Sequence, residues 1–170
     1  MDFLTLAKER FSTRDFSDRQ IEEEKLTILK EAARVAPTAK NNQPQKVYLF
    51  RSEEALSKIR ANTPSAYNAP AVFAICCDSN KAWKQPFSGD SMVNVDAAIV
   101  TTHIMLAAES VGLGSCFVCY FDPDKFKLVF NLPENITPVA LLPVGYKSES
   151  CKPAPRHFER NSIDDFITEL

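Results

Sequence analysis

The sequence is poor in glycine. It has four glycines in 170 residues, at positions 89, 112, 114 and 145, and it contains neither a GxGxxG nor a GxxxxGK[ST] stretch. Proteins that bind nucleotide phosphates commonly use such glycine-rich loops, whose backbone amides approach the phosphate closely. A phosphate that binds to this chain therefore needs side-chain ligands.

The sequence also lacks an excess of charge of either sign. The formal net charge is −2, and no run of lysine or arginine occurs. Because proteins that bind nucleic acids carry clustered basic residues, we expect no nucleic-acid partner. With 45% hydrophobic and 25% charged residues, the composition is that of a globular protein. Its length suits one domain, which we predict to span residues 1–170.

No apolar stretch is long and uncharged enough to cross a membrane. The longest, Val93 to Leu113, contains Asp96, His103 and Glu109, which would be costly in a bilayer. We predict a buried core helix there and no membrane partner. The N-terminus lacks the basic, apolar and small-residue regions of a signal peptide, so we expect a cytoplasmic protein.

The cysteines do not form a recognisable framework. There are five, an odd number, which argues against paired disulfides in a chain without a secretory signal. Cys116 and Cys119 form a CxxC, which suits a redox dithiol or half of a metal site. Further ligands at zinc-site spacing are missing, so we predict no metal site. A structural role for both cysteines is favoured over a redox role, which stays open.

Two arginines flank a hydroxyl near the N-terminus, in the stretch RFSTR. Arg10 and Arg14 carry permanent charge and planar forks of donors that match a phosphate or a carboxylate, and Ser12 adds a hydroxyl and an amide. This pattern suits an anion site. By spacing alone, however, surface arginines that pair with the nearby carboxylates Glu9, Asp15 and Asp18 are favoured over an anion site, because such surface pairs are common.

Helical and strand-like patterns alternate along the chain, which predicts a layered sheet flanked by helices, of α/β or α+β class. Residues 78–92 show no periodicity and are read as a surface connection or a mobile lid. A capping box at Ser162 and Asp165 predicts a last short helix. The other predicted helices are 3–10, 21–36, 53–60, 94–111 and 123–130, and the predicted strands are 46–51, 71–77, 115–121 and 139–146.

Four motifs, in order, resemble the nitroreductase family of FMN-dependent flavoproteins over nearly the whole chain. They are the Arg10-x-Ser12-x-Arg14 motif, APTAKNNQP (36–44), LAAESVGLGS (106–115), and LPE (132–134) followed by PVGY (143–146). The resemblance implies an α+β fold with a mixed central sheet flanked by helices. It also implies a homodimer with an extensive interface, in which each chain is a single FMN-binding domain.

The resemblance assigns roles to residues that spacing alone leaves open. It implies that Arg10 contacts the FMN phosphate, that Ser12 contacts FMN through its hydroxyl or backbone, and that Arg14 lies near the pyrimidine side of the isoalloxazine. A loop of the second subunit, at Pro37 to Asn41, would touch the same flavin. The implied cofactor-binding set is Arg10, Phe11, Ser12, Arg14, Pro37, Thr38, Ala39, Asn41, Cys119, Tyr120, Arg156 and Arg160.

The chain departs from the family pattern in three places. Cys119 and Tyr120 stand where the family often has a glycine beside the flavin, which predicts a tighter pocket. Gln45 replaces the usual tryptophan, and Asn62 is only a weak match for a polar pair before the second core strand. The insertion that often shapes substrate access is missing.

The implied activity is an oxidoreductase. A hydride would pass from NADH or NADPH to flavin N5, and a nitroaromatic or quinone would then take two electrons in a ping-pong cycle. No protein general acid or nucleophile is implied, and His103 is read as a core histidine. The alternatives are an FMN-storing or redox-sensing flavoprotein with little turnover, and a CxxC thiol oxidoreductase without flavin.

Overall fold

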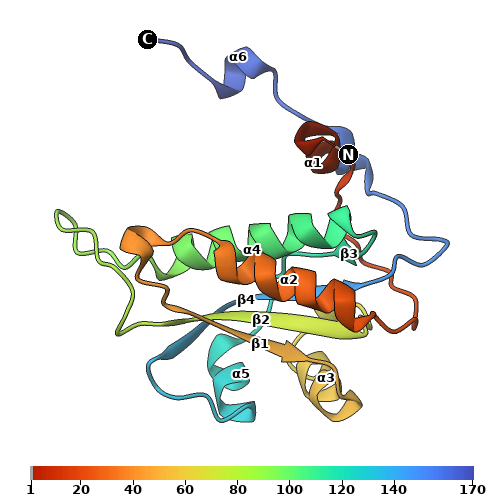
Figure 1. The fold of residues 1–170 in the computed structure, drawn as a ribbon, viewed down its shortest axis with the longest axis horizontal. Helices are drawn as coiled ribbons and strands as arrows, with labels where there is room; N and C mark the ends of the chain where they lie inside the picture. The colour runs from red at the N-terminus through yellow and green to blue at the C-terminus, as the bar shows by residue number, and fades with distance from the viewer. Residues whose placement is uncertain (1) are drawn as a thin grey trace.

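The computed structural model describes residues 2–170 and contains a four-stranded sheet with helices on both faces (Figure 1). The strands are β1 (Gln45–Phe50), β2 (Ala71–Asp78), β3 (Gly114–Ser115) and β4 (Ile136–Gly145), in the order β1-β2-β4-β3. The α+β class is confirmed. All three strand pairs are antiparallel, and parallel pairing within residues 2–170 is limited to the isolated bridge Ser12–Ser115. The sheet is therefore antiparallel, not mixed.

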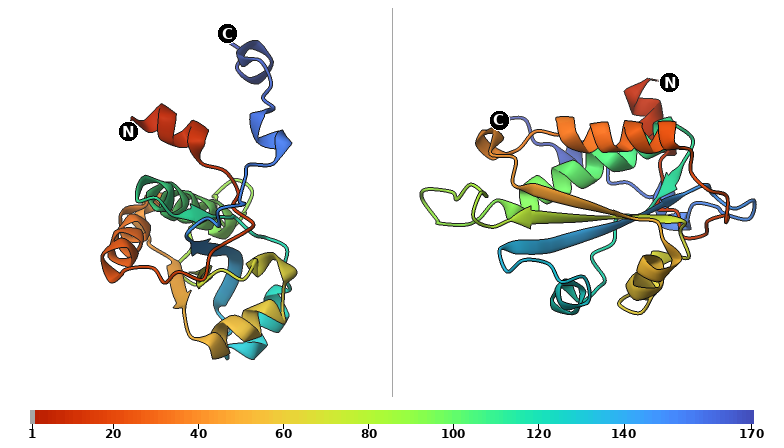
Figure 2. Two further views of the ribbon diagram at one scale, coloured as in Figure 1. Left: turned by 90° about the vertical axis from the view of Figure 1, so that its right-hand side faces the viewer. Right: turned by 60° about the horizontal axis from the view of Figure 1, so that its bottom comes forward.

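The predicted helices are present, with small changes at their ends. Helices α2 and α4 cover one face of the sheet, and α3 and α5 cover the other (Figures 1 and 2). Asp122 caps α5 by accepting a hydrogen bond from the amide of Lys125 (2.9 Å). The bounds are α1 (Phe3–Glu9), α2 (Glu23–Val35), α3 (Glu53–Arg60), α4 (Val93–Ser110), α5 (Pro123–Val129) and α6 (Ile163–Phe166), with 3-10 turns η1 (Ala39–Asn41), η2 (Pro64–Ala66) and η3 (Pro155–Phe158).

The strand predicted at 115–121 is mostly wrong. Strand β3 ends at Ser115, and only an isolated bridge from Val118 to Leu141 follows. The reason lies in β4: the carbonyl of Pro143 accepts a hydrogen bond from the amide of Cys116 (3.2 Å), but proline has no N–H to return one on that side. The ladder is interrupted there.

The core has two layers because helices cover both faces of the sheet. Along β2, Phe73 and Ile75 face the α2–α4 layer, whereas Val72 and Ala74 face the α3–α5 layer, and all four are buried. Helix α4 contributes Val100, Ile104 and Ala108, each with 0% exposure. The predicted core helix is present, but only one side of it is buried, and Val95 on another side is 52% exposed. None of the helices in residues 2–170 has the length and hydropathy that crossing a membrane requires.

The two ends of the described chain project from the body. Helix α1 and the C-terminal tail, residues 155–170, extend away from the sheet on the α4 side (Figures 1 and 2). Helix α1 has no buried residue. The hydroxyl of Ser162 accepts a hydrogen bond from the amide of Asp165 (3.1 Å), as the predicted capping box requires. Both ends expose large apolar side chains, including Phe3, Leu4, Phe158, Ile163 and Phe166.

Residues 78–92 form an ordered connection between β2 and α4. The amide of Gln85 donates to the carbonyl of Asp90 (2.8 Å), and the amide of Met92 donates to the carbonyl of Trp83 (2.9 Å). These bonds make a narrow turn that projects beside the start of α4 (Figure 1). Phe87 lies in this turn and is 95% exposed.

Candidate functional site

The segment that follows α1 runs along the end of the sheet. The amide of Thr13 donates to the carbonyl of Ser115 (2.9 Å), and the amide of Ser17 donates to the carbonyl of Tyr146 (2.9 Å). The amide of Ser148 closes the pattern by donating to the carbonyl of Asp15 (3.2 Å). Backbone bonds to β3 and to the end of β4 thus fix the stretch that carries Arg10, Ser12 and Arg14.

Close packing holds this segment against β3. A Cβ added at Gly114 would lie 2.4 Å from Oγ1 and 2.8 Å from Cγ2 of Thr13, so a larger residue would displace one of them. Thr13 and Ser115 are fully buried, and no described residue hydrogen-bonds their hydroxyls. Gly114 of the GLGS motif is therefore needed for the N-terminal segment to pack closely against β3.

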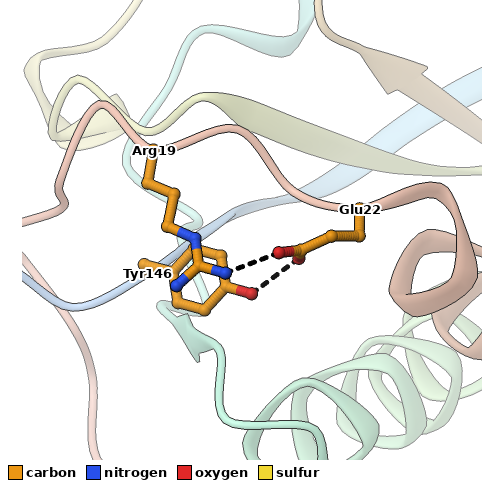
Figure 3. A network of polar contacts seen from close by, with 3 residues as sticks. All are labelled: Arg19, Glu22 and Tyr146. Atoms are coloured by element: carbon orange, nitrogen blue, oxygen red, sulfur yellow. Dashed lines mark hydrogen bonds and ion pairs between the residues drawn. The ribbon is translucent and has the colours of Figure 1, made fainter.

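A second anchor lies where the segment enters α2 (Figure 3). The hydroxyl of Tyr146 donates to Oε2 of Glu22 (2.6 Å), and Nη2 of Arg19 lies 2.6 Å from Oε1 of the same carboxylate. The guanidinium of Arg19 also lies over the Tyr146 ring, 3.9 Å from its centroid. The Tyr146 hydrogen bond, helped by Arg19, lowers the pKa of Glu22 to about 2.

The N-terminal motif and the C-terminal tail share one cavity, with a volume of about 640 Å³. Phe11 is buried at its edge, where its ring meets that of His157 edge-on at 6.1 Å and lies 4.7 Å from Nζ of Lys147. Two segments separated by about 140 residues thus meet, as expected. The lining residues are Arg10, Phe11, Ser12, Arg14, Ala154, Pro155, Arg156, His157, Glu159 and Arg160.

Four arginines of this cavity form no ion pair within residues 2–170, although Glu159 also lines the cavity. Of the eight arginines, Arg19, Arg34, Arg51 and Arg60 each form an ion pair with a glutamate. The other four all line the cavity, and none of them has a carboxylate within ion-pair distance in the part of the chain that the structure describes. Guanidinium groups gathered in this way fit a phosphate or another anion.

The alternative of surface ion pairs with Glu9, Asp15 or Asp18 is wrong. Oδ2 of Asp15 accepts hydrogen bonds from the hydroxyls of Ser148 and Ser150 instead. These bonds lower the pKa of Asp15. The tail after β4 thus binds the one carboxylate within the RFSTRD stretch and leaves both arginines to the cavity.

The predicted Pro37–Asn41 loop does not reach this cavity within one chain. The loop follows the C-terminal end of α2, whereas the segment with Arg10 and Arg14 precedes its N-terminal end (Figure 1). Helix α2 has 13 residues, so it spans about 20 Å. The amide of Ala39 donates instead to Oδ1 of Asp96 at the start of α4 (2.9 Å).

Cys119 and Tyr120 are exposed and do not line the arginine cavity. The hydroxyl of Thr63 donates to the carbonyl of Tyr120. Asn62, the weak candidate for a polar pair, exchanges two hydrogen bonds with the backbone of Asp122 (3.1 and 3.2 Å) and so positions the start of α5.

The CxxC cysteines are free thiols. Cys116 is buried, and its burial raises the pKa of the thiol, whereas reactive cysteines have a lowered one. This favours the structural interpretation. Nδ1 of His103 lies 2.9 Å from the carbonyl of Ile99 in its own helix, so the ring has a hydrogen-bond partner, but the residue is only half-buried and is not part of the core. Within residues 2–170, no three His, Cys, Asp or Glu residues are grouped closely enough to hold a metal ion.

The sequence reasoning missed several residues of the cavity. His157 and Glu159 line the cavity and lie between the two predicted tail arginines. Lys147, which follows the PVGY motif directly, does not line the cavity but contacts the ring of Phe11, which does. Lys147 bridges to Glu109 at 2.7 Å and covers Phe11. Their positions beside predicted site residues were the available signal.

Proteins of one known family resemble this chain in sequence. The nitroreductase family model matches residues 7–66 and 58–146, most of the chain. The chain belongs to the nitroreductase family. This nitroreductase-family protein is 30% identical over 162 residues to a relative from Methanothermobacter thermautotrophicus with the provisional name NADH dehydrogenase/NAD(P)H nitroreductase, covering 88% of this chain and 80% of the relative.

Solved structures of other nitroreductases are similar in fold. A nitroreductase family protein from Clostridium difficile 630 is 38% identical, with a TM-score of 0.93, and the match covers 99% of this chain and 98% of that one. An FMN-dependent nitroreductase from Clostridium difficile R20291 is 25% identical, with a TM-score of 0.76 and coverage of 89% and 91%.

Proposed function

We propose that this nitroreductase-family protein is an FMN-dependent oxidoreductase that takes electrons from NADH or NADPH and binds FMN at the arginine cavity. The observation that carries the proposal is the convergence of four arginines without carboxylate partners on one cavity. The names of the relatives support it, since they describe NAD(P)H-dependent and FMN-dependent enzymes.

The residues of the cavity have the right chemistry for this cofactor. Arg10, Arg156 and Arg160 offer guanidinium donors to the phosphate, and Ser12 adds a hydroxyl. Arg14 supplies a positive charge for the pyrimidine side of the flavin, which becomes more negative on reduction. When bound, FMN supplies a hydride acceptor at N5 and two-electron chemistry that no side chain of this protein provides. The protein binds and orients the reactants.

We further propose a homodimer in which the Pro37–Asn41 loop of one subunit completes the cavity of the other. The proposal is supported by the position of the loop, which lies beyond the opposite end of α2 from the cavity. It is also supported by the apolar side chains exposed on α1 and the tail, which suit contact with a partner surface. Cys119 and Tyr120 are assigned to backbone contact with the flavin.

The acceptor proposed is a nitroaromatic or a quinone, reduced by two electrons in a ping-pong cycle. The rival function is a flavoprotein that stores FMN or senses redox state. Turnover separates the two: in an enzyme, NAD(P)H reduces the flavin and the acceptor re-oxidises it in repeated cycles, whereas a storage or sensing protein shows little such turnover.

The test compares the purified protein with Arg10→Ala and Arg51→Ala under anaerobic conditions. The unmodified protein is expected to show flavin absorption that NADH or NADPH bleaches and a quinone or nitroarene restores. Arg10→Ala is expected to lose at least about 10-fold in FMN affinity, because a hydrogen bond to a charged group contributes about 1.5–3 kcal/mol. Arg51→Ala removes an arginine that pairs with Glu23 and leaves binding unchanged. Full flavin occupancy in Arg10→Ala contradicts the phosphate assignment.

A further inference from the structure

The loop between α2 and β1 has an unusual backbone. Lys40, Asn41 and Gln43 have positive φ angles of 53°, 54° and 49°, and none of them is glycine. Left-handed conformations cost free energy for residues with a Cβ, so a loop with three of them persists only where its surroundings hold it. Such strain concentrates where a structure is preset for binding.

Side-chain hydrogen bonds hold this loop. Oγ1 of Thr38 accepts from the amide of Gln43 (3.1 Å), and Nδ2 of Asn42 donates to the carbonyl of Lys81 (3.0 Å). Both bonds are exposed. Nε2 of Gln43 also donates to the carbonyl of Asn41 (3.4 Å), and the part-buried bond of the loop joins the Ala39 amide to Oδ1 of Asp96 (2.9 Å), a residue 57 positions away. Thr38 makes no capping bond to η1, so Asp96 caps this turn from another helix.

The burial of the Asp96 carboxylate costs free energy of folding. Asp96 is 1% exposed, and its second oxygen, Oδ2, has no hydrogen-bond partner among residues 2–170. Burial of an unsatisfied carboxylate oxygen disfavours folding. The first turn of α4 offsets part of this cost, because the N-terminal end of a helix favours negative charge. The remaining free-energy cost of burying this carboxylate suggests a role, which we assign to the hydrogen bond with the loop.

We propose that Asp96 is a positioning residue that presets the Thr38–Asn41 loop for the flavin of the second subunit. The inference rests on the proposed function, because that function gives the loop its ligand. Asp96 itself is buried and contacts the loop through the Ala39 amide, so it acts through the loop. Its carboxylate fixes the Ala39 amide and so the turn in which Thr38, Ala39 and Asn41 are presented.

The test uses two uncharged replacements of similar size. Asp96→Asn keeps an oxygen that accepts the Ala39 hydrogen bond, whereas Asp96→Leu fills the same space without an acceptor. Thr101→Val is the control on the same helix, because Thr101 is fully buried and its hydroxyl donates only to Ala97. Amide hydrogen exchange of residues 38–43 in the flavin-free protein and the FMN dissociation constant are measured for all three.

In Asp96→Leu, we expect exchange at Ala39 to rise and FMN affinity to fall, each by at least about 10-fold. Asp96→Asn is expected to stay within about 3-fold of the unmodified protein in both measurements. The proposal is overturned if Asp96→Leu matches Asp96→Asn or Thr101→Val, or if affinity falls while loop exchange stays unchanged.

The two proposals fail differently. If the unmodified protein binds no FMN, the proposed function and the flavin role of the loop both fail. If it binds FMN and Asp96→Leu binds equally well, only the role of Asp96 fails. The hydrogen exchange of the flavin-free protein reports on the Asp96–Ala39 contact in either case.

Discussion

The carboxylate of Glu22 connects the N-terminal segment to the end of the sheet through hydrogen bonds. It accepts the Tyr146 hydroxyl and pairs with Arg19, and its pKa falls from 4.5 to about 2. A folded-state pKa below the unfolded value means that the ionised carboxylate stabilises the fold above about pH 4.5. This contribution is lost as the pH falls towards 2.

Glu22→Gln is therefore expected to lower the unfolding temperature at pH 7, because it removes the charged acceptor. The difference from the unmodified protein should shrink as the pH falls from about 4.5 to 2, where Glu22 itself becomes protonated. Thermal unfolding followed by circular dichroism across this pH range measures it. Glu24→Gln, an exposed neighbour, is the control. An unfolding-temperature difference that stays constant with pH contradicts the assignment.

The sequence predicts the chemistry of Arg10 and Arg14 but not their partners. Their chemistry indicated an anion site, whereas spacing alone favoured pairing with nearby carboxylates such as Asp15. The partners of Asp15 are Ser148 and Ser150, which lie 133 and 135 positions away. Only the folded chain shows that this carboxylate is already bound, and that the arginines face a cavity with the tail.

Among the elements, the short strand β3 controls where the RFSTR segment lies. Gly114 permits contact with Thr13, and the Thr13 amide continues the pairing of the sheet edge by donating to Ser115. A methyl group at position 114 would force the two elements apart. The cost of overpacking is typically about 1–3 kcal/mol.

Gly114→Ala is thus expected to destabilise the protein by about 1–3 kcal/mol and to weaken FMN binding. Thr13→Ala in the same chain removes the two closest clashing atoms and should recover part of the loss. Urea unfolding of the two single variants and the double variant measures the coupling. Additive losses would show that Thr13 and Gly114 are not packed as described.

The elements themselves were largely predictable, and the main exception depends on a residue of another strand. Helix α2 follows from apolar periodicity and from Pro37 beyond its end, and helix α4 follows from a long apolar stretch that ends before Gly112. The strand after Gly114 was predicted too long because its residues are strand formers, whereas its length depends on Pro143 in its partner. Pairing partners are a property of the fold and not of the segment.

Across the whole molecule, the two parts of the predicted site lie at opposite ends of α2 (Figure 1). The arginine cavity is formed by the N-terminal segment and the tail, and the Thr38–Asn41 loop is held by α4. Periodicity and spacing do not reveal this separation, and the expectation of a site shared between two subunits came from the family resemblance alone. The structure adds that the cavity and the loop are each ordered by their own anchors.

The most direct test of this account mixes two defective subunits. Arg10→Ala damages the cavity, and Thr38→Ala with Asn41→Ala damages the loop. Each variant is expected to bind little FMN alone. In a heterodimer purified through two different affinity tags, one site carries both defects, and the other combines an intact cavity with an intact loop.

The account predicts one FMN per heterodimer, measured by flavin absorbance against protein concentration, with the affinity of the unmodified protein at that site. The unmodified homodimer, prepared with the same two tags, should bind two. A heterodimer that binds no more FMN than the defective homodimers would contradict a site built from the cavity of one subunit and the loop of the other.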